Sequence, residues 1–218
     1  SFNTESGALS GTPTDAHVGS HQVVLTATDR AGLVDTQSFT IDVTNVNDAP
    51  TVATPIANRS IDQDSFFGFQ FGLQVFKDVD VGDRLTYTAT LASGGELPSW
   101  LTFDPETRTF SGTPENDDVG AILVKVTATD SRGVTVSDTF TITVSNINDA
   151  PTITSTAITA INEDVAYNYT LVASDVDAGD AITLAATTLP SWLSFNTESG
   201  ALSGTPTDAH VGSHQVVL

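Results

Sequence analysis

The chain carries two identical copies of one long segment. Residues 1–25 recur without a change as residues 194–218, and a diverged third copy lies between them. In that third copy, LPSWLTFDPETRTFSGTP at 97–114 matches LPSWLSFNTESGALSGTP at 189–206. Identity over 25 residues arises by duplication, and the spacing of the copies predicts an array of similar domains rather than one large fold.

A second motif marks the boundaries of the repeated unit. NVNDAPT at 45–51 returns as NINDAPT at 146–152, which sets a unit of about 101 residues. A domain of that length can bury a hydrophobic core of its own. The sequence therefore predicts the C-terminal half of one domain at 1–46, a complete domain at 47–148 and the N-terminal part of a third at 149–218.

Within a unit, short β-rich runs alternate with turn residues. In VTVSDTFTITV, Phe140, Ile142 and Val144 alternate with threonines, as expected of a strand with one buried face. The tetrapeptide Asp104 to Thr107 has the composition of a hairpin turn. No segment has a helical period. About seven strands in a domain of this size predict an all-β, Ig-like Greek-key sandwich.

The net charge restricts the partners of the chain. Seven Lys and Arg residues oppose 27 Asp and Glu residues, for a formal charge of -20. Such a surface repels phosphate backbones and anionic lipids, so nucleic acid and membranes are predicted to be poor partners, and no membrane insertion is expected. No apolar run approaches the roughly 20 residues of a membrane span, and no signal peptide is present. The chain has no cysteine and therefore no disulfide.

The acids cluster in two equivalent loops. Asp78, Asp80 and Asp83 share DVDVGD, and the counterpart DVDAGD holds Asp175, Asp177 and Asp180. Like charges so close resist ionisation unless a cation lies among them. Ca²⁺ prefers carboxylate and carbonyl oxygens, so a hard divalent cation is predicted. An EF-hand is excluded, because Gly82 is fifth rather than sixth in the loop and Ala89 stands where the twelfth-position Glu would be.

Five motifs occur in a fixed order along the chain: NxNDAP, DVDxGD, PSWLxF, SGTP and xVGxxxVxxTATDxxG. This ordered set resembles the bacterial cadherin-like repeats, specifically the dystroglycan-type group. The resemblance covers nearly the whole chain. It implies seven-stranded Ig-like sandwiches, with calcium at the junctions between domains, in a large secreted or surface-anchored bacterial adhesin.

The resemblance also implies a set of calcium ligands. The first junction would use Asn45, Asn47, Asp48, Asp78, Asp80 and Asp130, and the second Asn146, Asn148, Asp149, Asp175 and Asp177. The domain before each junction would add a short acid motif and an acid near its first strand. Asn116 and Asp118 match the short acid motif, and Gln63 or Asp64 matches the acid near the first strand. In the first domain, Asp15 and His17 stand at the acid motif, and Asp29 is the copy of Asp130. With fewer acids than the family pattern, one or two ions per junction are expected.

The remaining candidate sites are better explained as structure. Trp100 and Trp192 both lie in a PSWL motif, next to a leucine at the end of an expected strand. This position fits a residue packed in the hydrophobic core better than one that stacks on a sugar ring. His17 and His21 are four residues apart, which on a strand separates the rings by about 13 Å and disfavours a transition-metal site. No nucleophile elbow, P-loop or dinucleotide fingerprint appears, so the chain is predicted not to be an enzyme.

The expected function is mechanical, with two alternatives. Calcium at the junctions would turn a flexible string into a rod that supports adhesion. Alternatively, the repeats bind carbohydrate or an identical repeat. The expected partners are neighbouring repeats, a polysaccharide, and a second molecule in head-to-tail contact, since 1–46 and 149–218 each correspond to part of a domain.

Overall fold

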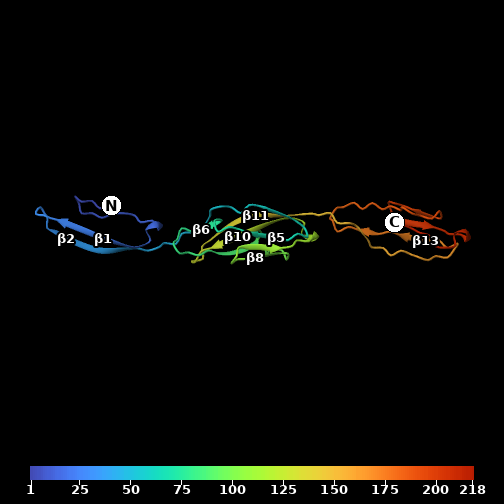
Figure 1. Cartoon of the computed structure of the whole chain (residues 1–218), viewed down its shortest axis with the longest axis horizontal. Coiled ribbons are helices and arrows are strands. Elements are labelled where there is room, and N and C mark those ends of the chain that lie inside the picture. Colours follow the sequence, from blue (N-terminus) through green and yellow to red (C-terminus); the bar gives the residue numbers. More distant parts are fainter. The chain divides into compact units, whose positions relative to one another are not determined.

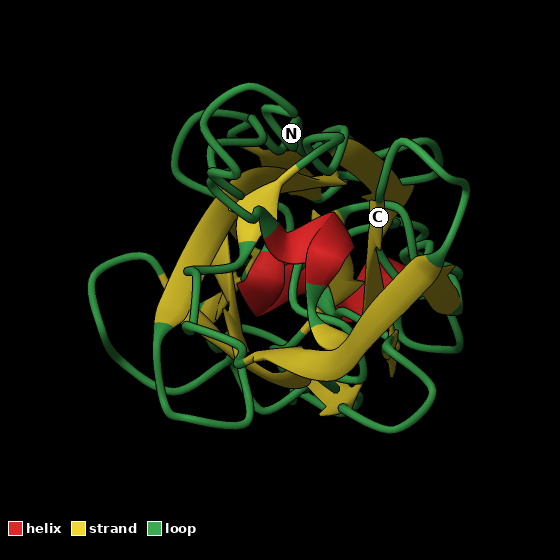
Figure 2. Cartoon of the chain, turned by 90° about the vertical axis from the view of Figure 1, so that its left-hand side faces the viewer, coloured by secondary structure: helices red, strands yellow, loops and turns green.

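The computed structural model describes residues 1–218, which form two compact units, Ser1–Ser145 and Asn146–Leu218. The helices are three short 3-10 turns, η1 (Asp15–His17), η2 (Asn116–Asp118) and η3 (Asp208–His210), and all other regular structure is β-strand (Figure 2). The predicted all-β class is confirmed. None of these helices has the length or apolar character needed to cross a bilayer.

Most strands are short and belong to the middle repeat, residues 47–148 (Figure 1). The first repeat contributes β1 (Gly19–Thr28) and β2 (Val34–Val43). The middle repeat contains β3 (Thr51–Val52), β4 (Arg59–Asp62), β5 (Phe67–Gln70), β6 (Phe76–Lys77), β7 (Thr86–Leu91), β8 (Leu101–Asp104), β9 (Thr109–Gly112), β10 (Gly120–Thr129) and β11 (Thr135–Ser145). Unit 2 contains β12 (Thr152–Ile153), β13 (Tyr167–Thr170), β14 (Ala173–Ser174), β15 (Leu193–Phe195) and β16 (Ala201–Gly204).

The middle repeat is a β-sandwich. One sheet has the order β4-β11-β10-β7 and the other β5-β9-β8, with β3 and β6 forming a further pair. β10 and β11 make a long antiparallel hairpin, and β4 joins β11 in parallel. Phe140, Ile142 and Val144 on β11 are buried while their threonine neighbours are more exposed, so the predicted alternation is confirmed.

An aromatic cluster fills the sandwich. Phe110 is fully buried and lies with its ring centroid 4.6 Å from that of Phe103 and 5.6 Å from that of Phe140. Each buried phenylalanine contributes about 1.5–3 kcal/mol of transfer free energy. Trp100 packs edge-on against Phe67, 6.2 Å between centroids, and belongs to the partly buried shell of this core. The interpretation of Trp100 as a core residue is confirmed.

The glycine of the SGTP motif is required by a close backbone approach. A Cβ on Gly112 would lie 1.7 Å from the carbonyl oxygen of Trp100, and one on Gly204 would lie 1.9 Å from that of Trp192. Only glycine permits these contacts. The same strand packing therefore occurs in the middle and third repeats.

Unit 2 has strands that correspond to β3, β5, β6, β8 and β9, whereas the segments that correspond to β4 and β7 form no strand. β13, β16 and β15 form one sheet, and β12 pairs with β14. The ring of Trp192 lies edge-on to that of Tyr167, with 6.0 Å between centroids. Tyr167 and Leu202 are buried in this unit.

Candidate metal centre

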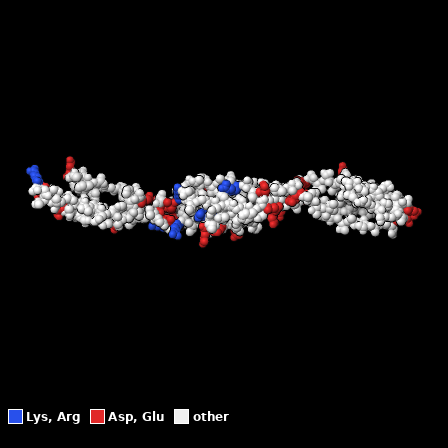
Figure 3. Space-filling model, viewed as in Figure 1, with Lys and Arg blue, Asp and Glu red and all other residues white.

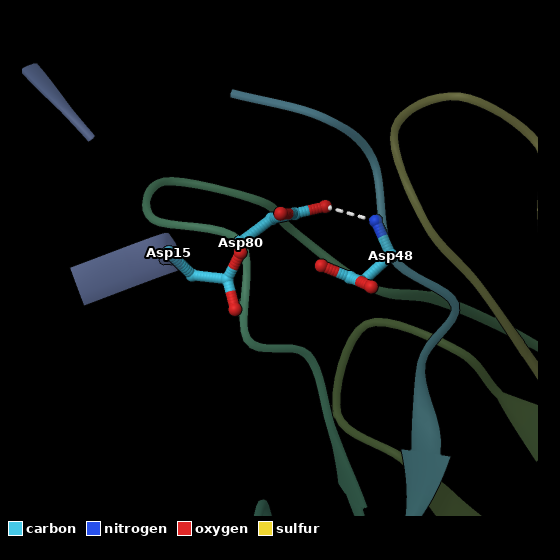
Figure 4. A group of neighbouring side chains, drawn as sticks. All are labelled: Asp15, Asp48 and Asp80. Atoms are coloured by element: carbon cyan, nitrogen blue, oxygen red, sulfur yellow. Dashed lines mark hydrogen bonds between the residues drawn. The ribbon is translucent and has the colours of Figure 1, made fainter. Parts of the chain in front are cut away.

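Three carboxylates from distant parts of the sequence meet in unit 1. Asp15 comes from η1, Asp48 from the linker between β2 and β3, and Asp80 from the loop after β6. One oxygen from each lies within 4.8 Å of the others (Figure 4). The backbone N–H of Asp48 donates to Oδ2 of Asp80 at 2.9 Å, which fixes the linker against the loop. We call this group the linker cluster.

Asp80 is the buried member of the linker cluster. Its side chain is 6% exposed, and its Oδ1 is buried with no hydrogen-bond partner. The backbone N–H of Asp80 donates to Oδ1 of Asp78 at 2.9 Å, so the loop holds itself in a tight turn. A buried carboxylate oxygen without a donor is costly unless a cation neutralises it.

A second group lies beside the first. Asp78 and Asp83 of the same loop approach Asp130, and one oxygen from each lies within 4.8 Å of the others. Asp130 is 5% exposed. It accepts hydrogen bonds from Asn47 Nδ2 at 2.8 Å and from the backbone N–H groups of Arg132 at 2.9 Å and Val134 at 2.8 Å. We call this group the loop cluster.

The loop cluster also contains buried oxygens without donors. Oδ2 of Asp78 and Oδ2 of Asp83 are buried and unpartnered, although the hydroxyl of Ser131 donates to the other oxygen of Asp83. The donors around this group therefore satisfy only part of its charge. An oxygen-binding cation would satisfy the remainder.

The pKa values of two acids report opposite environments. Repulsion from Asp15 raises the pKa of Asp48 above its ordinary value, and partial desolvation and the charges of Asp80 and Asp78 add to the effect. The side-chain amide of Asn47 lowers the pKa of Asp130 by donating a hydrogen bond to it, with further donation from backbone N–H groups, while desolvation opposes the shift. A neighbouring positive charge would therefore favour the ionised form of Asp48.

Unit 2 repeats the acidic loop. One oxygen from each of Asp175, Asp177 and Asp180 lies within 4.8 Å of the others. Asp177 is 5% exposed, and its Oδ1 is buried without a partner, as in Asp80. The backbone N–H of Asp149 donates to Oδ2 of Asp177 at 2.6 Å.

The linker asparagines lie against these groups. The Nδ2 of Asn47 donates to the carbonyl of Asp48 at 2.9 Å, and that of Asn148 to the carbonyl of Asp149 at 2.8 Å. The Oδ1 atoms of Asn45 and Asn47 are buried without a donor, which leaves them available as oxygen ligands. Asn146 opens unit 2.

Other sequence candidates lie elsewhere in unit 1. Asn116 and Asp118 form η2, where Oδ2 of Asp118 accepts from the N–H of Glu115 at 2.9 Å. The Nε2 of Gln63 donates to Oδ1 of Asn116 at 2.5 Å, whereas Asp64 is exposed in a left-handed turn with φ 59°. Of the two alternatives, Gln63 is therefore the one that contacts the acid motif.

Asp29 has a structural counterpart in the loop cluster. Its Oδ1 accepts from the N–H groups of Ala31 and Leu33, both at 2.8 Å, in the turn between β1 and β2. Asp130 makes the same turn between β10 and β11. Asp83 and Asp180 were absent from the ligand set implied by the resemblance, although the crowding of acids in their loops pointed to them.

The donor sets fit calcium. All members are carboxylates or amide oxygens, with no thiol and no imidazole in any of the three groups. Ca²⁺ takes six to eight such oxygens, whereas softer metals prefer nitrogen and sulfur. The acids greatly outnumber the cationic side chains on the surface (Figure 3).

The comparisons with known proteins agree with this architecture. The He_PIG family, "Putative Ig domain", matches residues 1–44, 49–145 and 150–218. The "Serine-rich adhesin for platelets" of Staphylococcus aureus (strain N315) is 32% identical over 181 residues, which cover 83% of this chain. The chain spans only 7% of that relative's length.

Solved cadherin ectodomains share the fold. The structure of PcdhgB3 EC1-4 has a TM-score of 0.60 at 17% identity and covers 99% of this chain, which covers 55% of it. The Protocadherin GammaB4 extracellular domain has a TM-score of 0.51 at 18% identity, over 93% of this chain and 37% of its own. The chain therefore belongs to the He_PIG family of Ig-like domains, as a tandem array of cadherin-like repeats related to those of a bacterial adhesin.

Proposed function

We propose that the chain is a calcium-stiffened spacer and adhesive module of a large extracellular bacterial protein. The linker cluster carries the proposal, because it joins one carboxylate from the first repeat, one from the linker and one from the middle repeat. A cation bound by Asp15, Asp48 and Asp80 would tie all three parts to one point. The linker would then lose its freedom, and the two repeats would hold a fixed angle.

The electrostatics favour this assignment. Without a cation, Asp15 and Asp48 repel each other, as the raised pKa of Asp48 indicates. Binding of Ca²⁺ converts the repulsion into attraction, and its free energy is added to the stability of the ordered junction. In this proposal the acids hold the cation that orders the junction. We therefore assign them a structural role and assign the module no enzymatic activity.

Small-angle X-ray scattering in calcium and in excess EDTA tests the proposal, alongside calorimetric titration with calcium. We expect saturable calcium binding, and a more extended and less flexible particle in calcium than in EDTA. Asp80→Asn preserves side-chain shape but removes charge, so it should reduce this response. Identical scattering with and without calcium would overturn the proposal.

The third repeat supplies a matched control. Asp104 accepts from the backbone N–H of Glu106 at 2.9 Å, and Asn196 accepts from that of Glu198 at the same distance in the equivalent turn. Asp104→Asn therefore removes one carboxylate from the middle repeat while introducing a residue that the repeat family already uses there. Its scattering response to calcium should equal that of the unmodified chain.

A second candidate function is polysaccharide binding. A cleft of about 770 Å³ in the middle repeat is lined by Arg84, Tyr87 and Arg108 together with Asp78 and Asp83 of the loop cluster. Guanidinium groups, a phenol and a cation site suit the hydroxyl and carboxylate groups of sugars. Retention on insoluble acidic polysaccharide, lost with chelator and in Arg84→Gln but kept in Lys125→Gln, would support this function. Absence of retention in calcium would exclude it for the polysaccharides tested.

A further inference from the structure

Cationic side chains are concentrated in the middle repeat (Figure 3). Of the seven Lys and Arg residues of the chain, six lie at 59–132, and the remaining one is Arg30. Arg84 and Arg108 line one cleft of this repeat together with Tyr87. In a chain with so few cations, two guanidinium groups at one cleft indicate a site for an anionic group.

Arg108 occupies a backbone position that the other two repeats give to glycine. It precedes β9 with φ 59°, and its counterparts are Gly7 with φ 70° and Gly200 with φ 71°. A left-handed backbone is unfavourable for a residue with a side chain, whereas glycine adopts it freely. The middle repeat therefore carries an arginine here at a conformational cost, which indicates a function for the side chain.

The side chain of Arg108 is anchored beside the cleft. Its Nε donates to the carbonyl of Phe71 at 3.4 Å, and the backbone N–H of Phe71 donates to the carbonyl of Arg108 at 3.2 Å. The first bond uses Nε and leaves the two Nη groups for another acceptor. Burial raises the pKa of the Tyr87 phenol, and the charge of Arg108 opposes this rise, so the guanidinium group acts directly on the phenol.

The third repeat lacks all three of these side chains. When the acidic loops and the SGTP motifs of the two repeats are aligned, the counterparts of Arg84, Tyr87 and Arg108 are Ala181, Leu184 and Gly200. A Cβ on Gly200 would lie 3.1 Å from Cδ1 of Leu184, so these two equivalent positions adjoin in the third repeat as well. Both repeats therefore carry the acidic loop, but only the middle repeat adds the guanidinium groups and the phenol.

The acids of the cleft determine when it attracts an anion. Asp78 and Asp83 of the loop cluster line the cleft together with Glu106, so three carboxylates oppose two guanidinium groups. A cation in the loop cluster would neutralise Asp78 and Asp83 and leave the guanidinium groups in excess. An anionic ligand is then repelled by the cation-free cleft and attracted by the loaded one.

We propose, building on the polysaccharide-binding function above, that this cleft recognises the carboxylate of an acidic sugar when calcium occupies the loop cluster. The two carboxylate oxygens accept hydrogen bonds from Arg84 and Arg108, because a guanidinium fork matches a planar carboxylate. The sugar ring lies against Tyr87 and against Leu73, whose side chain is 63% exposed at the cleft. Arg108 thus sets the specificity of the middle repeat.

An NMR titration of the full chain with methyl β-D-glucuronide tests the proposal. In saturating calcium we expect a dissociation constant on the order of 1 mM, since a ligand of this size gains little free energy per atom. The amide signals of Arg84 and Tyr87 should shift, and those of Ala181 and Leu184 in the third repeat should not. Methyl β-D-glucoside lacks the carboxylate and acetate lacks the ring, so each should bind about tenfold more weakly.

Arg108→Gly is the decisive variant. It introduces the residue that both other repeats have at this position, so the fold should be retained. Binding of the glucuronide should weaken by about tenfold or more. Lys125→Gln removes a cation of β10 that does not line the cleft, so it should leave binding unchanged. Excess EDTA should abolish binding by the unmodified chain.

Four results would overturn the proposal. They are an absence of shifts with the glucuronide in calcium, an affinity that Arg108→Gly leaves unchanged, equal affinities for the glucuronide and the glucoside or acetate, and equal binding in calcium and in EDTA. None of them bears on the spacer function, which the scattering experiment tests. Retention of Arg108→Gly on insoluble polysaccharide would show that polysaccharide binding persists without this cleft.

Discussion

The acidic loops of the two units have nearly the same sequence, DVDVGD at 78–83 and DVDAGD at 175–180, but different surroundings. In unit 1 the loop divides its acids between two groups: Asp80 joins Asp15 and Asp48, while Asp78 and Asp83 join Asp130. In unit 2 the three acids of the loop form one group among themselves. The loop thus supplies a nucleus of three carboxylates in both units.

The difference shows what the rest of the fold contributes. In unit 1 the additional carboxylates come from η1, from the linker and from the turn between β10 and β11. They convert one group of three into two groups of three. We therefore expect two calcium ions to bind at the loop of unit 1, one in each group, and one at the three-acid group of unit 2.

The largest effect is expected for Asp177→Asn. Asp177 is the buried member of the three-acid group of this loop, so its loss leaves two of those three acids for the ion. Calcium affinity at this loop should fall by more than the roughly 10–100-fold that the loss of an outer-shell partner causes. Calorimetry should then show one ion fewer per chain. A loss no larger than that of Asp15→Asn would mean that residues outside the loop hold this ion too.

A smaller effect is expected for Asp15→Asn. Asp15 is half-buried and belongs only to the linker cluster, so the ion of the loop cluster should remain. One of the two ions at the loop of unit 1 should weaken by about tenfold, or 1.4 kcal/mol. The calcium-induced change in scattering should decrease, because the first repeat loses its hold on the ion. Simultaneous loss of both ions would contradict the division into two groups.

Much of the fold followed from patterns that are local in the sequence. The alternation around Phe140 predicted which face of β11 is buried, and the repeated motifs predicted equivalent elements in different repeats. The hydrophobic pattern predicts strands well because side chains alternate faces with a period of two. The need for glycine at position 112 was not predicted. The carbonyl of Trp100 excludes a side chain there, and only the pairing of β8 with β9 brings that carbonyl close.

The candidate site was less accessible to sequence reasoning. The acids of each loop were identified directly, but the choice between Gln63 and Asp64 stayed open. Ile61 on β4 is partly buried, and Gln63, two residues later on the same face, is 1% exposed. Asp64 falls on the other face and in a turn with positive φ. The register of β4 on β11 decides this, and a single sequence does not reveal that register.

The smallest expected effect is the release of protons when calcium binds near Asp48. The pKa of Asp48 in the folded chain is raised above 3.8, chiefly by Asp15. Because it is raised, this group's contribution to stability in the absence of calcium is present below 3.8 and is lost as the pH rises through the folded pKa. Asp130 has a lowered pKa, so its contribution is present above 3.8 and is lost as the pH falls through the folded pKa.

Calcium should reverse the shift at Asp48, because a cation favours the ionised carboxylate. Binding at a pH just above 3.8 should therefore release a fraction of a proton for each ion, measured by calorimetry in two buffers of different ionisation enthalpy. Because the pKa of Asp48 is the raised one, Asp48→Asn should reduce that fraction by more than Asp180→Asn in unit 2 does. Proton uptake on calcium binding would contradict the arrangement, since it would place the ion away from the repulsion between Asp15 and Asp48.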